Sequence, residues 1–122
     1  MNADPFTDRL ARVRDRFAVS LEAKIDNTCA AIPQLSALGP AAAATNAVAE
    51  AYRCVHGMVG VGPTVGFPET GRAAHDVEDV LRSPYREGRG LATAEIAQLT
   101  KTLQALREAA ARELQAFHSR QQ

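Results

Sequence analysis

The chain has 122 residues, and its 14 Lys and Arg residues balance 14 Asp and Glu residues, so the formal net charge is zero. This balance excludes the basic excess of a typical nucleic-acid-binding protein, and no apolar run approaches membrane-spanning length. The start of the chain is polar and lacks the charged and apolar regions of a secretory signal. We therefore expect one domain over residues 1–122, located in the cytoplasm, that binds neither nucleic acid nor membrane.

The first predicted helix begins with a capping acid and a proline, Asp4-Pro5. Apolar side chains then recur at spacings of three, four or seven residues and form one stripe: Phe6, Leu10, Val13, Phe17, Leu21, Ile25 and Ile32. Pro33 disfavours helical backbone at Ile32, so we expect the helix to end or kink there. Gly39-Pro40 marks the turn that follows.

Two further helices should follow in the middle of the chain. Residues 41–62 are rich in Ala, a strong helix former, and carry an apolar side. Pro63 should stop or bend this helix, because a proline inside a helix costs about 3 kcal/mol. We expect the next helix to run from near Pro68 to Arg82, where Ser83-Pro84 closes it.

The last predicted helix begins at Thr93, which can cap it. Its apolar side chains lie in register: Ile96, Leu99, Leu103, Leu106, Ala110, Leu114 and Phe117. The tail at residues 118–122 is expected to fray. Because no segment alternates with period two, the chain is predicted to be all-α, an antiparallel up-down four-helix bundle with short connections.

One cluster of polar residues could carry chemistry. His56 lies in the second predicted helix, and His75 and Glu78 lie three residues apart in the third, so they share a face. His56 precedes the turn near residues 63–67 by about ten residues, and Glu78 follows it by about as many. In an antiparallel pair both then lie roughly 15 Å from the turn. Contact between His56 and Glu78 is therefore expected.

Such a contact would activate the imidazole. A carboxylate that accepts a hydrogen bond from Nδ1–H selects one tautomer and leaves the lone pair of Nε2 pointing outward. That lone pair is a nucleophile for which a phosphoryl group is a suitable electrophile. Gly60, one turn after His56, leaves an open dent beside the ring that a partner protein could enter.

These residues resemble the histidine phosphotransfer (HPt) domain, most closely the version at the N-terminus of chemotaxis histidine kinases. The shared pattern is an aromatic-Arg pair before the histidine, glycine at +4, Gly-Phe at +10 and +11, and His and Glu at +19 and +22. It is filled by Tyr52-Arg53, His56, Gly60, Gly66-Phe67, His75 and Glu78. The resemblance implies that His56 accepts phosphoryl, that Glu78 orients it, and that His75 belongs to the same polar network. It also implies that Arg53, Val59 and Gly60 belong to the partner-binding surface, and that Gly66 serves the turn.

Two positions depart from the family pattern. Val59 stands where the family usually has a lysine that can offset phosphoryl charge, and Pro63 falls where the family helix normally continues. Neither change removes the nucleophile or its orienting carboxylate. Two interpretations of Arg53 stay open: it could steer an acidic receiver surface, or it could be an ordinary surface arginine.

The leading hypothesis is a phosphorelay intermediate rather than a self-sufficient kinase. It would receive phosphoryl from a receiver aspartate or a histidine kinase and pass it to a receiver aspartate. We expect a monomer with no cofactor and no metal of its own, because the receiver would bring the Mg²⁺ needed for transfer. The alternative is a non-catalytic adaptor that binds a kinase or response regulator without accepting phosphoryl.

A third and weaker hypothesis is a metal site made of His56, His75, Glu78 and Cys54. Cys54 lies two residues from His56 and therefore faces another side of its helix, and the chain has no CxxC or HExxH spacing. Both cysteines, Cys29 and Cys54, are expected to be small buried hydrophobic residues rather than a disulfide.

Overall fold

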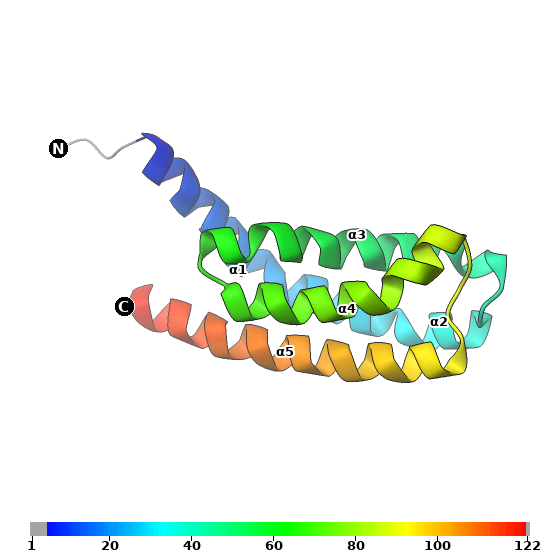
Figure 1. The fold of residues 1–122 in the computed structure, drawn as a ribbon. Helices are drawn as coiled ribbons and strands as arrows, with labels where there is room; N and C mark the ends of the chain where they lie inside the picture. Colours follow the sequence, from blue (N-terminus) through cyan, green and yellow to red (C-terminus); the bar gives the residue numbers. More distant parts are fainter. Residues whose placement is uncertain (1–4, 122) are drawn as a thin grey trace.

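The computed structural model describes residues 5–121, and all the long elements in this range are α-helices. The elements are α1 (Pro5–Ala30), α2 (Ile32–Leu38), a 3-10 turn η1 (Ala42–Ala44), α3 (Thr45–Val61), a 3-10 turn η2 (Pro63–Val65), α4 (Pro68–Glu87) and α5 (Thr93–Gln121). In Figure 1 the four long helices alternate in direction, and the turn between α3 and α4 lies at the same end as both termini. The predicted four-helix bundle is confirmed.

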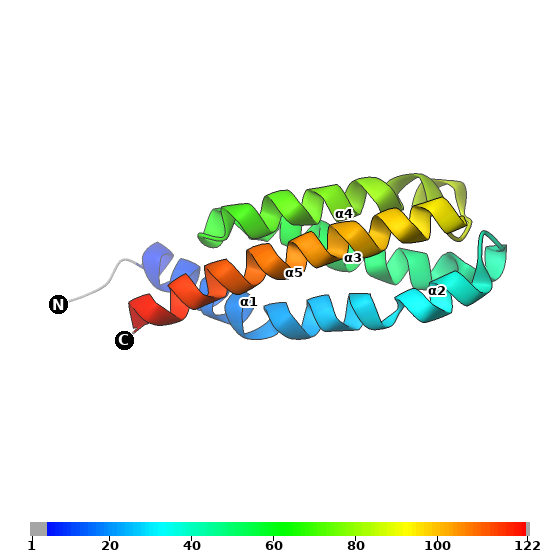
Figure 2. The same cartoon turned by 90° about the horizontal axis from the view of Figure 1, so that it is seen from below.

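The first apolar stripe is divided as its proline predicts. α1 ends at Ala30, and α2 begins at Ile32 with Pro33 in its first turn, where the missing N–H is tolerated. Figure 2 shows α2 continuing in nearly the direction of α1. The break at Ala31 is therefore a bend within one side of the bundle. The expected capping residue Asp4 lies outside the described residues.

Two predicted helix ends are wrong. α4 does not end before Ser83-Pro84 but continues through Pro84 to Glu87, and its last turn bends toward α3 in Figure 1. α5 extends to Gln121, so the tail from His118 through Gln121 is helical rather than frayed. At Pro84 the lost hydrogen bond produces a bend instead of an end, because the buried ring packs within the bundle.

The turn between α3 and α4 is built around proline and glycine. Pro63 ends α3 at Val61 and opens η2, so a 3-10 turn follows where another helical turn was possible. Gly66 closes η2 with φ of 95°, a left-handed conformation that favours glycine. Gly71 lets α4 approach this turn, since a Cβ there would lie 2.6 Å from Cδ of Pro63. This packing fixes where α4 begins relative to α3.

The core runs along the whole bundle. α4 packs most extensively against α3 and α5, and α1 packs against α5. The ring of Phe67 is fully buried and contacts Phe17 of α1 and Phe117 of α5, with ring centroids 5.2 and 5.9 Å apart. The largest fully buried side chains also include Leu21, Ile25, Leu35, Met58, Leu81, Leu91, Leu99, Leu103 and Leu106. No helix in residues 5–121 is long and apolar enough to cross a membrane.

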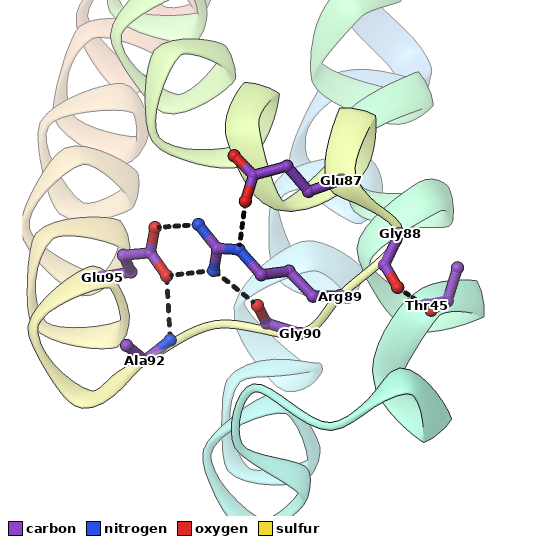
Figure 3. A network of polar contacts seen from close by, with 7 residues as sticks. All are labelled: Thr45, Glu87, Gly88, Arg89, Gly90, Ala92 and Glu95. Atoms are coloured by element: carbon purple, nitrogen blue, oxygen red, sulfur yellow. Dashed lines mark hydrogen bonds and ion pairs between the residues drawn. The ribbon is translucent and has the colours of Figure 1, made fainter.

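At the end of the bundle opposite the α3–α4 turn, a polar clamp fixes the loop between α4 and α5 (Figure 3). Arg89 donates to both carboxylate oxygens of Glu95, at 2.8 and 3.0 Å, and to Oε1 of Glu87 at 2.9 Å. Glu95 also accepts a hydrogen bond from the backbone N–H of Ala92, at 2.9 Å, which caps α5. Thr45 Oγ1 donates to the carbonyl of Gly88 at 3.1 Å and so ties the end of α4 to the start of α3.

Candidate functional site

His56 and Glu78 meet across the α3–α4 pair, as their register predicts. The side chain of His56 is 66% exposed, whereas that of Glu78 is 6% exposed, and Nδ1 of His56 contacts Oε2 of Glu78. An ionised carboxylate can only accept hydrogen bonds, so the proton of this contact belongs to Nδ1. In a neutral ring Nε2 then carries the lone pair, and within residues 5–121 it has no hydrogen-bond partner.

The other oxygen of Glu78 faces a cation that sequence reasoning missed. Nη2 of Arg82 lies 3.5 Å from Oε1 of Glu78, and Nη1 of Arg82 lies 2.5 Å from Oδ1 of Asp79. The hydrogen bond to Asp79 raises the pKa of the Arg82 guanidinium above its usual value, with smaller contributions from the charge of Glu78. The signal was present in the sequence, since Arg82 follows Glu78 by four residues, one helical turn.

His75 joins this group only indirectly. Its side chain is 53% exposed, and its Nδ1 lies 3.5 Å from Oδ2 of Asp79 rather than against His56 or Glu78. Asp79 in turn accepts from Arg82, which pairs with Glu78. The structure therefore places His75 at the outer end of a chain of polar contacts that leads to the buried carboxylate.

Two tyrosines extend the site on the other side of the imidazole. The ring of Tyr52 stacks on that of His56, with centroids 5.7 Å apart and planes 13° from parallel. The ring of Tyr85 stacks on Tyr52, with centroids 4.2 Å apart and planes 8° from parallel. The four-residue spacing from Tyr52 to His56 could have revealed the first contact. The second was hidden, because the predicted helix stopped before Tyr85.

The surface beside His56 has open space at two glycines of α3. A Cβ built at Gly57 or at Gly60 would meet no atom within 4 Å, so nothing in the described chain requires glycine there. Each glycine destabilises a helix interior by roughly 0.5–1 kcal/mol relative to alanine. Val59 is half-buried and packs against the core, while Arg53 is exposed one turn before His56. After His56, α3 therefore offers open space at Gly57 and Gly60 and carries no positive charge at Val59.

An apolar groove of about 410 Å³ adjoins this surface, between α1 and α3. Val13 and Phe17 of α1 line it together with Gly57, Met58 and Val61 of α3. Arg16, Ser20 and Lys24 complete the lining. The groove therefore combines apolar walls with the cations of Arg16 and Lys24. It also reaches Gly57, the residue after His56.

The structure does not assemble the hypothetical metal site. Sγ of Cys54 lies 3.7 Å from Oγ1 of Thr28 and 3.9 Å from the carbonyl of Lys24, on the side that faces α1. In the described residues, the ligand atoms that gather within 4.8 Å of one another come from His75, Asp76 and Asp79, all exposed. Cys29 and Cys54 are free thiols that pack against the core, as predicted, but they are half-buried rather than buried.

Comparison with protein families matches residues 12–109 to the Hpt domain. The chain belongs to the Hpt domain family. Hpt domains carry out histidine phosphotransfer in two-component systems, and they interact with histidine kinases and receiver domains. The matched region contains all of α3 and α4, and therefore His56 and Glu78. No curated protein and no solved structure matches the chain.

Proposed function

We propose that this Hpt domain is a phosphorelay intermediate in which His56 accepts and donates the phosphoryl group. The observation that carries the proposal is the pairing of an exposed imidazole with a buried carboxylate through Nδ1, which leaves Nε2 available to a partner. Glu78 is the orienting residue, because its contact selects the tautomer in which Nε2 is the nucleophile. His75 acts at a distance, through Asp79 and Arg82.

In the proposed step, Nε2 attacks the phosphorus of an aspartyl phosphate on a receiver domain. The N–P bond forms while the bond from phosphorus to the aspartyl oxygen breaks, and the aspartate leaves as a carboxylate. The imidazole becomes cationic and keeps its proton on Nδ1, hydrogen-bonded to Glu78. Because the positive charge develops only during transfer, the adjacent carboxylate favours the transition state over the resting ring. Transfer to the next receiver is the reverse of this step.

The surroundings of His56 support docking of a partner against α1 and α3. Glycines at 57 and 60 leave space that the chain itself does not use, and the adjoining groove is apolar. Arg16 and Lys24 in the groove suit a partner face that carries acidic side chains, and Arg53 adds an exposed cation on the His56 face. We assign Arg53, Val59 and Gly60 to this surface.

The finer parts of the proposal concern the state of the chain. We propose that it works as one domain and as a monomer, because the described helices share one core and transient relay contacts need only a modest interface. We also propose a cytoplasmic location, which fits two half-buried thiols that remain free. Sedimentation at micromolar concentration tests the monomer, and a stable dimer would contradict it.

The central experiment follows the phosphoryl label. The chain has three histidines, at positions 56, 75 and 118. Wild type is incubated with a panel of phosphorylated receiver and kinase domains, beside His56→Gln and the matched controls His75→Gln and His118→Gln. We expect acid-labile, base-stable label on wild type and both controls and none on His56→Gln. Label that persists on His56→Gln would refute the assignment, and tight binding without label would favour the adaptor.

A further inference from the structure

Both tyrosines of the chain lie in one stack with His56. The sequence contains two tyrosines and no tryptophan, and Tyr85, Tyr52 and His56 follow one another as near-parallel rings. Tyr52 is half-buried, and Tyr85 is 37% exposed. The stack therefore reaches from solvent to one face of the imidazole.

The backbone places Tyr85 in this stack by means of two local features. The first is Pro84, which lies inside α4 and can bend it. The last turn of α4 leans toward α3 (Figure 1). The second is the clamp of Figure 3, in which Arg89 holds Glu87 and Thr45 holds the carbonyl of Gly88. The turn that carries Tyr85 is thus anchored to α3 at Gly88, three residues after the tyrosine.

The bond to Cβ and the hydrogen bond at Nδ1 still allow small combined changes of χ1 and χ2, which tilt the imidazole. An aromatic face packed on the ring removes this freedom, because near-parallel rings lose contact when one of them tilts. The negative face of a phenol ring also attracts a cationic ring, the form that His56 takes when Nε2 is substituted. From its position against His56, Tyr52 can therefore restrict the orientation of the imidazole and stabilise its positive charge.

We propose that Tyr52, backed by Tyr85, is a positioning residue that holds the plane of the His56 ring for phosphoryl transfer. The inference rests on the proposed function of His56. It assigns to the bent end of α4 a role in the reaction, because that turn supports Tyr52 from behind. Glu78 sets which nitrogen is free, and the tyrosine stack sets where that nitrogen points.

The test compares Tyr52→Leu, Tyr52→Phe and Tyr85→Leu with wild type. Transfer from a phosphorylated receiver is measured as the rate at saturation and as KM. We expect Tyr52→Leu to lower the saturating rate about 3- to 10-fold, the worth of an aromatic pair, and to leave KM unchanged. Tyr52→Phe should restore the rate, and Tyr85→Leu should show a smaller loss. Ile32→Ala, a half-buried change in α2, controls for general destabilisation.

A second readout needs no phosphoryl transfer. The ring current of Tyr52 shields the His56 ring protons, so their NMR resonances should move downfield in Tyr52→Leu and stay in place in Tyr52→Phe and Ile32→Ala. Unchanged resonances, or a Tyr52→Leu variant that transfers at the wild-type rate, would overturn the positioning role and leave the proposed function standing. Absence of label on wild-type His56 would overturn both.

Discussion

Replacing Glu78 by glutamine tests how much the buried carboxylate contributes to transfer. The amide keeps the shape of the side chain and can still accept a hydrogen bond from Nδ1–H, but it cannot neutralise the ring when the ring becomes cationic. A hydrogen bond to a charged group contributes about 1.5–3 kcal/mol, against about 0.5–1.5 kcal/mol for a neutral one. The difference of about 1–1.5 kcal/mol corresponds to roughly a 10-fold slower transfer.

The burial of Glu78 explains why its replacement should slow transfer. Glu78 is 6% exposed, so water does not replace its charge, and Oε1 is already occupied by Arg82. Glu78→Ala removes the acceptor altogether and should slow transfer about 100-fold, from the loss of about 2–3 kcal/mol.

The assay is single-turnover transfer of labelled phosphoryl from a receiver, with thermal unfolding of each variant as a check on folding. Asp76→Asn is the matched control, because Asp76 is an exposed acid on the same helix and should leave the rate unchanged. If Glu78→Gln transferred as fast as wild type, the carboxylate would not stabilise the cationic ring.

Three further outcomes are expected. Val59→Lys should lengthen the lifetime of the phosphohistidine about 2- to 5-fold, since an exposed ion pair contributes up to about 1 kcal/mol; an unchanged half-life would show that the missing lysine is harmless. Gly90→Ala should lower the free energy of unfolding by about 3 kcal/mol, because its Cβ would lie 2.0 Å from the carbonyl oxygen of Gly39. The hydrogen bond from Arg89 lowers the pKa of Glu95, so the stability lost in Glu95→Gln should be largest near neutral pH and shrink below about pH 5.

Matched controls test the predictions for Gly90→Ala and Glu95→Gln. Gly57→Ala is the control for Gly90→Ala, since a Cβ at Gly57 meets nothing within 4 Å and a helical alanine should raise stability slightly. Equal effects of the two substitutions in urea unfolding would contradict the packing argument. For the acid effect, unfolding of wild type and Glu95→Gln is followed from pH 7 to pH 3. A difference that stayed constant would show that the carboxylate charge of Glu95 does not act through Arg89.

Much of the fold follows from local sequence. Apolar spacing locates the four long helices, and the bend at Ala31 and the turn at Gly66 follow from proline and glycine chemistry. These features depend on backbone geometry and on periodicity, which act over a few residues. The contact of His56 with Glu78 could also be predicted, because antiparallel neighbours joined by a short turn pair residues at equal distances from it.

Only the tertiary structure decided how the end of α4 packs against α3. Pro84 reads locally as a stop, yet packing of its buried ring lets α4 continue and bend, and this bend brings Tyr85 onto Tyr52. Local spacing could suggest the pairs of Arg82 with Glu78 and of Arg89 with Glu95, whereas the orientation of these side chains depends on the packed helices. The contact between Tyr85 and Tyr52 joins side chains distant in sequence, so no local pattern encodes it. The helices and the register of His56 with Glu78 could be predicted from the chain alone, whereas the stacking of Tyr85 on Tyr52 required the packed bundle.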